Sequence, residues 1–73
     1  MKITVESTTK IVHLSGIPAR IWEGRTQTGI PVHVFITRIA VASEADTSQF
    51  DRELAECSPP SAEVAAYPAK LIL

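Results

Sequence analysis

The chain has 73 residues, with a hydrophobic fraction of 45%, a charged fraction of 21% and a formal net charge of −1. This length fits one domain with one core, and a net charge near zero argues against general nucleic-acid binding. The single cysteine, Cys57, excludes an internal disulfide, and no Cys/His spacing is typical of a structural zinc site. A chain this short buries only about 60–65% of its unfolded surface, so we expect oligomerisation to supplement its stability.

The N-terminal segment, residues 2–14, is predicted to be extended. Ile3 and Val5 alternate with polar residues, and Ile11 and His13 share one parity further along. The pattern fits either one long strand bent near residues 7–9 or two short strands. The chain has no apolar run typical of a signal peptide or a membrane span, so we expect a cytoplasmic protein with no membrane partner.

A hairpin over residues 17–26 and 30–42 follows a two-residue turn at Ser15-Gly16. Gly29 provides a turn position with positive φ between the two strands. The second strand is apolar on both faces, which indicates that both faces are covered. Its apolar residues are Val32, Val34 and Ile36 on one face and Phe35, Ile39 and Val41 on the other.

The register of this hairpin depends on the length of its loop. A two-residue loop at 28–29 would place Trp22 opposite Phe35, whereas a three-residue loop at 27–29 would place Trp22 opposite Val34. The sequence leaves both registers open.

A helix is predicted over residues 47–57, with Asp46 or Thr47 as its N-cap. Its narrow apolar stripe consists of Phe50, Leu54 and Cys57 at positions i, i+4 and i+7. We expect Phe50 and Leu54 to be buried against the sheet, because a helix of about 11 residues is marginal by itself.

The tail, residues 59–73, is predicted to be extended, since Ser58-Pro59-Pro60 ends the helix. Its last residues, Leu71, Ile72 and Leu73, are too apolar for a free end, so we expect them in an oligomer interface or packed on their own sheet. These elements predict one α+β domain over residues 1–73. Its fold would be an antiparallel β-meander of three or more strands with one short helix packed across it and an apolar C-terminal tail or strand.

Charge is unevenly distributed along the chain. Residues 1–42 carry five Lys or Arg against two Glu, a net +3, and residues 43–73 carry two basic against six acidic residues, a net −4. The simplest interpretation is that the acidic half folds back on the basic half.

One group of side chains on the hairpin suggests binding. Basic sheets that carry aromatic residues stack single-stranded bases in several modules, and arginines also grip small anions. The alternative is that Trp22 and Phe35 belong to the core while the arginines solvate the strand ends. The candidate ligand- or partner-binding residues are Arg20, Trp22, Arg25, His33, Phe35 and Arg38.

The sequence holds no pattern typical of catalysis, of a metal site or of a cofactor site. In the register of the shorter loop, His13 and His33 face positions about 20 Å apart along one strand, too far to share an ion. Cys57 has no general base nearby in the sequence, so we interpret it as a small core residue. We therefore expect no enzymatic activity, no metal and no cofactor.

Residues 18–24, Pro-Ala-Arg-Ile-Trp-Glu-Gly, and residues 29–39, Gly-Ile-Pro-Val-His-Val-Phe-Ile-Thr-Arg-Ile, resemble small uncharacterised proteins of phages and prophages. The resemblance implies an accessory role, in which the chain modulates a host or defence factor by binding it, and it assigns no functional residues. We therefore expect a non-catalytic interaction module that forms a homo-oligomer, most simply a dimer. The alternatives are binding or sequestering of a small nucleotide-like anion, and single-stranded nucleic-acid binding by the basic hairpin.

Overall fold

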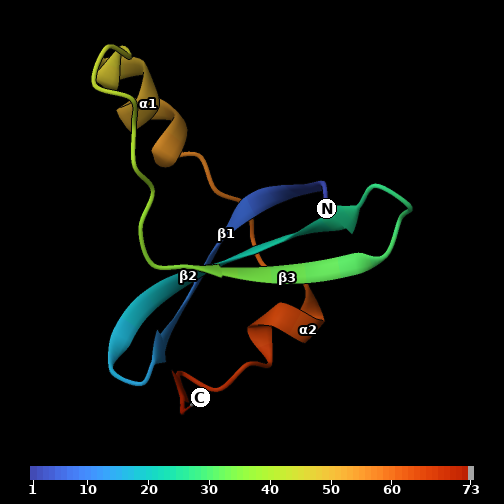
Figure 1. Ribbon diagram of the computed structural model, residues 1–73. Coiled ribbons are helices and arrows are strands. Elements are labelled where there is room, and N and C mark those ends of the chain that lie inside the picture. The colour runs from blue at the N-terminus through green and yellow to red at the C-terminus, as the bar shows by residue number, and fades with distance from the viewer. Residues whose placement is uncertain (73) are drawn as a thin grey trace.

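The computed structural model describes residues 1–72 and shows an α+β domain built on a four-stranded mixed sheet (Figure 1). The predicted α+β class is confirmed. The elements in chain order are β1 (Ile3–Leu14), β2 (Ile17–Thr26), β3 (Pro31–Ile36), α1 (Thr47–Leu54), α2 (Ala62–Ala65) and β4 (Lys70–Leu71). The sheet order is β3-β2-β1-β4. β1 pairs antiparallel with β2 and β2 with β3, whereas β4 runs parallel to β1.

A two-residue turn joins β1 to β2, as the sequence predicted. Leu14 pairs with Ile17, and Ser15 and Gly16 between them have φ of 48° and 88°. Positive φ at both central positions is what a type I′ turn requires, and the twist of that turn matches the twist of the flanking strands.

β1 is irregular in its middle, within the region where the sequence allowed a bend. Its register with β2 shifts between Ser7 and Ile11. Thr8 is buried at this bulge, and its hydroxyl donates to the carbonyl of Ile21 at 2.6 Å. The hydroxyl therefore satisfies a backbone group at the point where the strand pairing is interrupted.

The β2–β3 connection is the three-residue loop, one of the two alternatives that the sequence left open. Thr26 donates its N–H to the carbonyl of Ile30 at 2.9 Å, and Gly29 has φ 92°. Trp22 therefore lies opposite Val34. Glycine suits this left-handed position because it has no side chain to be strained there.

β3 ends at Ile36, whereas the sequence indicated a strand as far as residue 42. Ile36 pairs with Arg20, and continuing that register would place Arg38 opposite Pro18. Because proline has no N–H to donate, the ladder cannot be extended there. Residues 37–46 instead connect β3 to α1 outside any helix or strand.

The core lies on one face of the sheet. Val12 from β1, Ile21 from β2 and Val64 from α2 are fully buried, and Ser61 caps α2 by accepting from the N–H of Val64 at 3.3 Å. The tail that the sequence predicted to be extended therefore contains a helix, and that helix completes the core. Leu14, Phe35, Tyr67 and Leu71 pack around these three residues.

α1 covers the sheet much less than predicted. The expected burial of Phe50 and Leu54 is wrong, because α1 has no buried residue and Leu54 is 47% exposed. Asp46 caps the helix as predicted, with its carboxylate 3.0 Å from the N–H of Ser48. The helix ends before Cys57, so its apolar stripe is only two residues long and too narrow for close packing. Figure 1 shows α1 and α2 on opposite sides of the sheet.

Candidate functional site

An apolar groove of about 300 Å³ lies between α1 and the sheet face that α2 does not cover. Arg20 and Trp22 reach it together because residues two apart on a strand share a face. This volume is at the lower end of the range for small-ligand pockets. We call this site the groove; its lining includes Ile11, Arg20, Trp22, Arg38, Phe50 and Leu54.

The two arginines of the groove have no carboxylate partner in the part of the chain that the structure describes. Arg20 is partly buried, and its Nη1 donates to the carbonyl of Thr8 at 2.7 Å and to Cys57 Sγ at 3.7 Å. Arg38 is exposed. Because a guanidinium carries five N–H donors, Arg20 is held in place and still has donors for an anion.

The wall formed by α1 is fastened to the sheet just after its C-terminal end. Ser7 donates its hydroxyl to the carbonyl of Glu56 at 2.8 Å. Ser58 donates its N–H to the carbonyl of Ser7 at 3.0 Å and accepts from the N–H of Thr9 at 3.0 Å. At the other end, a hydrogen bond from the Ser48 side chain lowers the pKa of the capping Asp46. The bulge of β1 therefore positions α1 over the groove.

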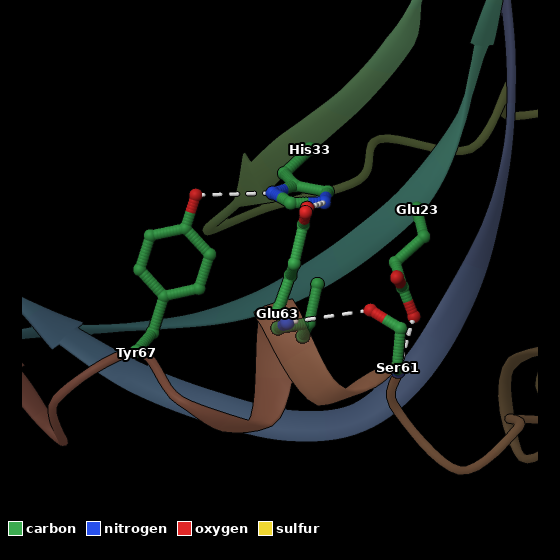
Figure 2. Close-up of polar contacts among 6 residues, drawn as sticks. Glu23, His33, Ser61, Glu63 and Tyr67 are labelled. Carbon is green, nitrogen blue, oxygen red and sulfur yellow. Dashed lines mark hydrogen bonds and ion pairs between the residues drawn. The ribbon is translucent and has the colours of Figure 1, made fainter.

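The other three candidate residues lie away from the groove. Phe35 packs beside the core, edge-on to Tyr67 with ring centroids 5.2 Å apart. His33 Nδ1 lies 3.0 Å from Tyr67 Oη, and His33 Nε2 lies 3.7 Å from the Glu63 carboxylate (Figure 2). Arg25 donates to a loop carbonyl at 3.2 Å. Strand alternation thus separates Arg20 and Trp22 from the three residues on the opposite face, and Arg38, which lies beyond β3, joins the groove.

Polar contacts attach α2 to the sheet on the face opposite the groove. Glu23 accepts from the N–H of Ser61 at 2.9 Å, and Figure 2 shows this contact beside His33 and Glu63. Hydrogen bonding by the hydroxyl and the N–H of Ser61 lowers the pKa of Glu23. We assign this cluster a structural role, because it holds α2 where Val64 enters the core.

The predicted interface residues at the C-terminus have different environments. Leu71, in β4, packs against the core, and its carbonyl accepts from the N–H of Ser15 at 2.7 Å. Ile72 is 92% exposed. Leu73 lies outside the described residues.

Three apolar residues of the groove had no place in the predicted site. Phe50 and Leu54 form a helical stripe in the sequence, and that stripe predicts burial in the core instead of a binding site. Ile11 lies opposite Arg20 only because the bulge of β1 shifts the register by two residues. A bulge of this kind has no sequence signal beyond the threonines that precede Ile11.

No family model, curated protein or solved structure matches this chain. The resemblance to phage and prophage proteins therefore remains a prediction. Among residues 1–72, no group of three or more His, Cys, Asp or Glu side chains is placed to hold a metal ion. None of the helices that the structure describes is long and apolar enough to cross a membrane.

Proposed function

We propose that this chain is a non-catalytic binding module that acts through protein–protein contact, with the groove as its contact surface. One observation carries the proposal. Trp22, the single tryptophan of the chain, is only partly buried and lines the groove instead of the core. An indole ring that packs outside the core contributes less to the stability of a small domain than one inside it, unless a partner covers the part that stays exposed.

The surroundings of Trp22 favour a protein as that partner. Ile11, Ile39 and Leu54 line the same groove and are 45%, 43% and 47% exposed. Contiguous exposed apolar surface with a polar rim is typical of interaction sites. Tryptophan and arginine are also the residues that most often dominate binding energy in protein interfaces. The unpaired Arg20 and Arg38 further favour a partner with acidic groups.

The experiment compares capture by the wild-type chain with capture by two variants in the native host. Ile11→Glu places a charge in the groove, and Ile30→Glu places the same charge on the β2–β3 loop, where Ile30 is 60% exposed. We expect the wild type and Ile30→Glu to capture the same protein, which can be an untagged copy of the chain itself. Ile11→Glu should lower the captured amount at least about tenfold. Equal capture by all three chains would contradict the proposal.

Binding of a nucleotide-like anion is the second candidate, because Trp22, Arg20 and Arg38 meet in one groove. An indole ring stacks on a base, and a guanidinium binds phosphate through paired hydrogen bonds. A panel of mono-, di- and cyclic nucleotides should then raise the unfolding temperature. Arg20→Ala and Arg38→Ala should abolish the rise, and Arg25→Ala, which lies outside the groove, should preserve it. No response from any nucleotide would remove this candidate.

Single-stranded nucleic-acid binding is not proposed. It requires one continuous basic and aromatic platform, and the six hairpin residues are divided between the groove and the opposite face of the sheet.

A further inference from the structure

We propose that the occupant of the groove is a second copy of this chain, in a two-fold dimer whose groove faces meet. In this dimer the acidic segment in and beside α1, residues 44–56, of each copy lies against Arg20 and Arg38 of the other. We call it the acidic α1 segment. The inference rests on the proposed function, because it names the partner of the same surface.

The surface area of the isolated chain supports a partner of this size. Its accessible area is 5634 Å², whereas a compact monomer of 7.9 kDa has about 4,400 Å². The excess of about 1,200 Å² is more than the roughly 800 Å² that each partner buries in a standard interface. The Cα radius of gyration, 13.3 Å, likewise exceeds the roughly 11 Å of a compact domain of this length.

Three of the eight exposed large apolar side chains among the described residues gather at the groove. The opposite face is closed by Val64 and Tyr67, which pack on the core residues of β1 and β2. On the groove face, α1 contributes no buried residue, and Figure 1 shows it standing away from the strands. Ile11, Ile39 and Leu54 are therefore left exposed around Trp22. A second groove face would bury all of these residues at once.

The groove is bordered by basic strands on one side and by the acidic α1 segment on the other, so two copies of it can attract each other. The salt bridge within residues 1–72 joins His33 to Glu63, so the basic strands and the acidic α1 segment form no ion pair with each other. The acidic half therefore meets the basic half in an ion pair only through Glu63, beside α2, and not through the α1 segment, among the described residues. The acidic residues in and beside α1 are Glu44, Asp46, Asp51, Glu53 and Glu56, with Arg52 as the basic residue among them.

In a two-fold dimer, the basic side of each copy can lie against the acidic side of the other. In a two-fold interface the same patch is used by both copies, so a residue at one side of the patch meets the other side of the partner's patch. The sheet wall of the groove carries Arg20 and Arg38, and the helix that forms the other wall carries exposed carboxylates. When the helix of each copy lies against the sheet wall of the other, two equivalent sets of opposite-charge contacts form. A partner that carries charges of only one sign would leave one of these sets unmatched.

Sedimentation equilibrium tests the dimer directly. We expect the wild type and Ile30→Glu to sediment at about twice the chain mass of 7.9 kDa. Leu54→Glu should raise the dissociation constant at least about tenfold, because it places a charge in an apolar contact. Circular dichroism confirms that each variant is folded.

Charge reversal tests the arrangement of the two copies. One chain carries Arg38→Glu, and the other carries Asp51→Lys and Glu53→Lys; all three positions are exposed. Each chain by itself should dimerise more weakly than the wild type, because its own patch becomes repulsive. Mixing the two chains should give a heterodimer that is tighter than either homodimer, because the carboxylate introduced by Arg38→Glu in one chain then meets the lysines of the other and the unchanged Arg38 meets the unchanged acidic helix.

The outcomes separate this inference from the proposed function. A wild type that stays monomeric, or a dimer insensitive to Leu54→Glu, overturns the inference. If the wild type forms a dimer that Leu54→Glu weakens, but mixing the two charge-reversed chains gives no heterodimer, the placement of α1 against the arginines of the other copy is overturned. If the chain is monomeric but Ile11→Glu still abolishes capture of another protein, the proposed function stands and the partner is not a second copy. If capture is also independent of the groove, both fail.

Discussion

Ile21 and Trp22 are neighbours in β2 and have opposite environments. Ile21 is fully buried beneath α2, and Trp22 lines the groove on the other face. The alternation of the strand could be predicted from the sequence, but the face that would form the core could not. That face is set by Val64, an isolated apolar residue among alanines with no periodic pattern around it.

The first residue-scale prediction contrasts the two helices. Val64→Ala should lower the free energy of unfolding by about 2–3 kcal/mol, through lost burial and a residual cavity. Leu54→Ala should lower it by less than about 0.5 kcal/mol in dilute solution, since the side chain is already 47% exposed. Urea denaturation followed by circular dichroism measures both. A larger loss for Leu54→Ala would mean that α1 is packed on its own sheet after all.

The second residue-scale prediction concerns Glu23 and acid. Hydrogen bonding by Ser61 lowers the pKa of Glu23 in the folded state below its ordinary value of 4.5. The contribution to stability is therefore present above pH 4.5 and is lost as the pH falls through the lower folded-state value. Denaturation between neutral and acidic pH should show this loss in the wild type. Glu23→Gln should be less stable at neutral pH and should lack this part of the pH dependence.

At the scale of elements, the features that could be predicted are those set by neighbouring residues in the sequence, namely the turns and the start of α1. The turns at Gly16 and Gly29 were recognisable because positive φ favours glycine, and the start of α1 was recognisable because Asp46 is a strong N-cap. α2 and β4 are four and two residues long. Such segments are shorter than any hydrophobic period, so they depend on contacts with β1 and β2 that the sequence alone does not display.

The pairing of β1 with β2 gives the prediction at this scale. Gly24 lies opposite Val5, and a Cβ at position 24 would overlap the backbone carbonyl of Thr4. Gly24→Ala must therefore push the two strands apart and should cost about 2 kcal/mol or more. Gly16→Ala is the control: its added Cβ meets no atom within 4 Å, and the cost of its positive φ should be about 1 kcal/mol. Urea denaturation should rank the two variants in this order, and the reverse order would contradict the close approach.

At the scale of the whole molecule, the sequence showed that the chain has a basic half and an acidic half. It also showed, through a second strand apolar on both faces, that more surface needs covering than one short helix can provide. The sequence could not predict whether this apolar surface is covered by the same chain or by another molecule. Contacts within one chain and contacts between chains produce the same pattern of apolar and charged residues. The structure narrows this choice by leaving Arg20 and Arg38 without carboxylates in the part of the chain that it describes.

Trp22 provides a spectroscopic prediction for the whole assembly. It is the single tryptophan, it lines the groove and it is partly exposed in one chain, so a facing copy should exclude water from its ring. Its fluorescence should therefore lie at shorter wavelength in concentrated solution and shift to longer wavelength on dilution, as mass action separates the copies. Leu54→Glu should give the long-wavelength spectrum at every concentration, whereas Ile30→Glu should follow the wild type. A spectrum that does not change on dilution, in a protein that sedimentation shows to dissociate, would place the dimer contact away from the groove.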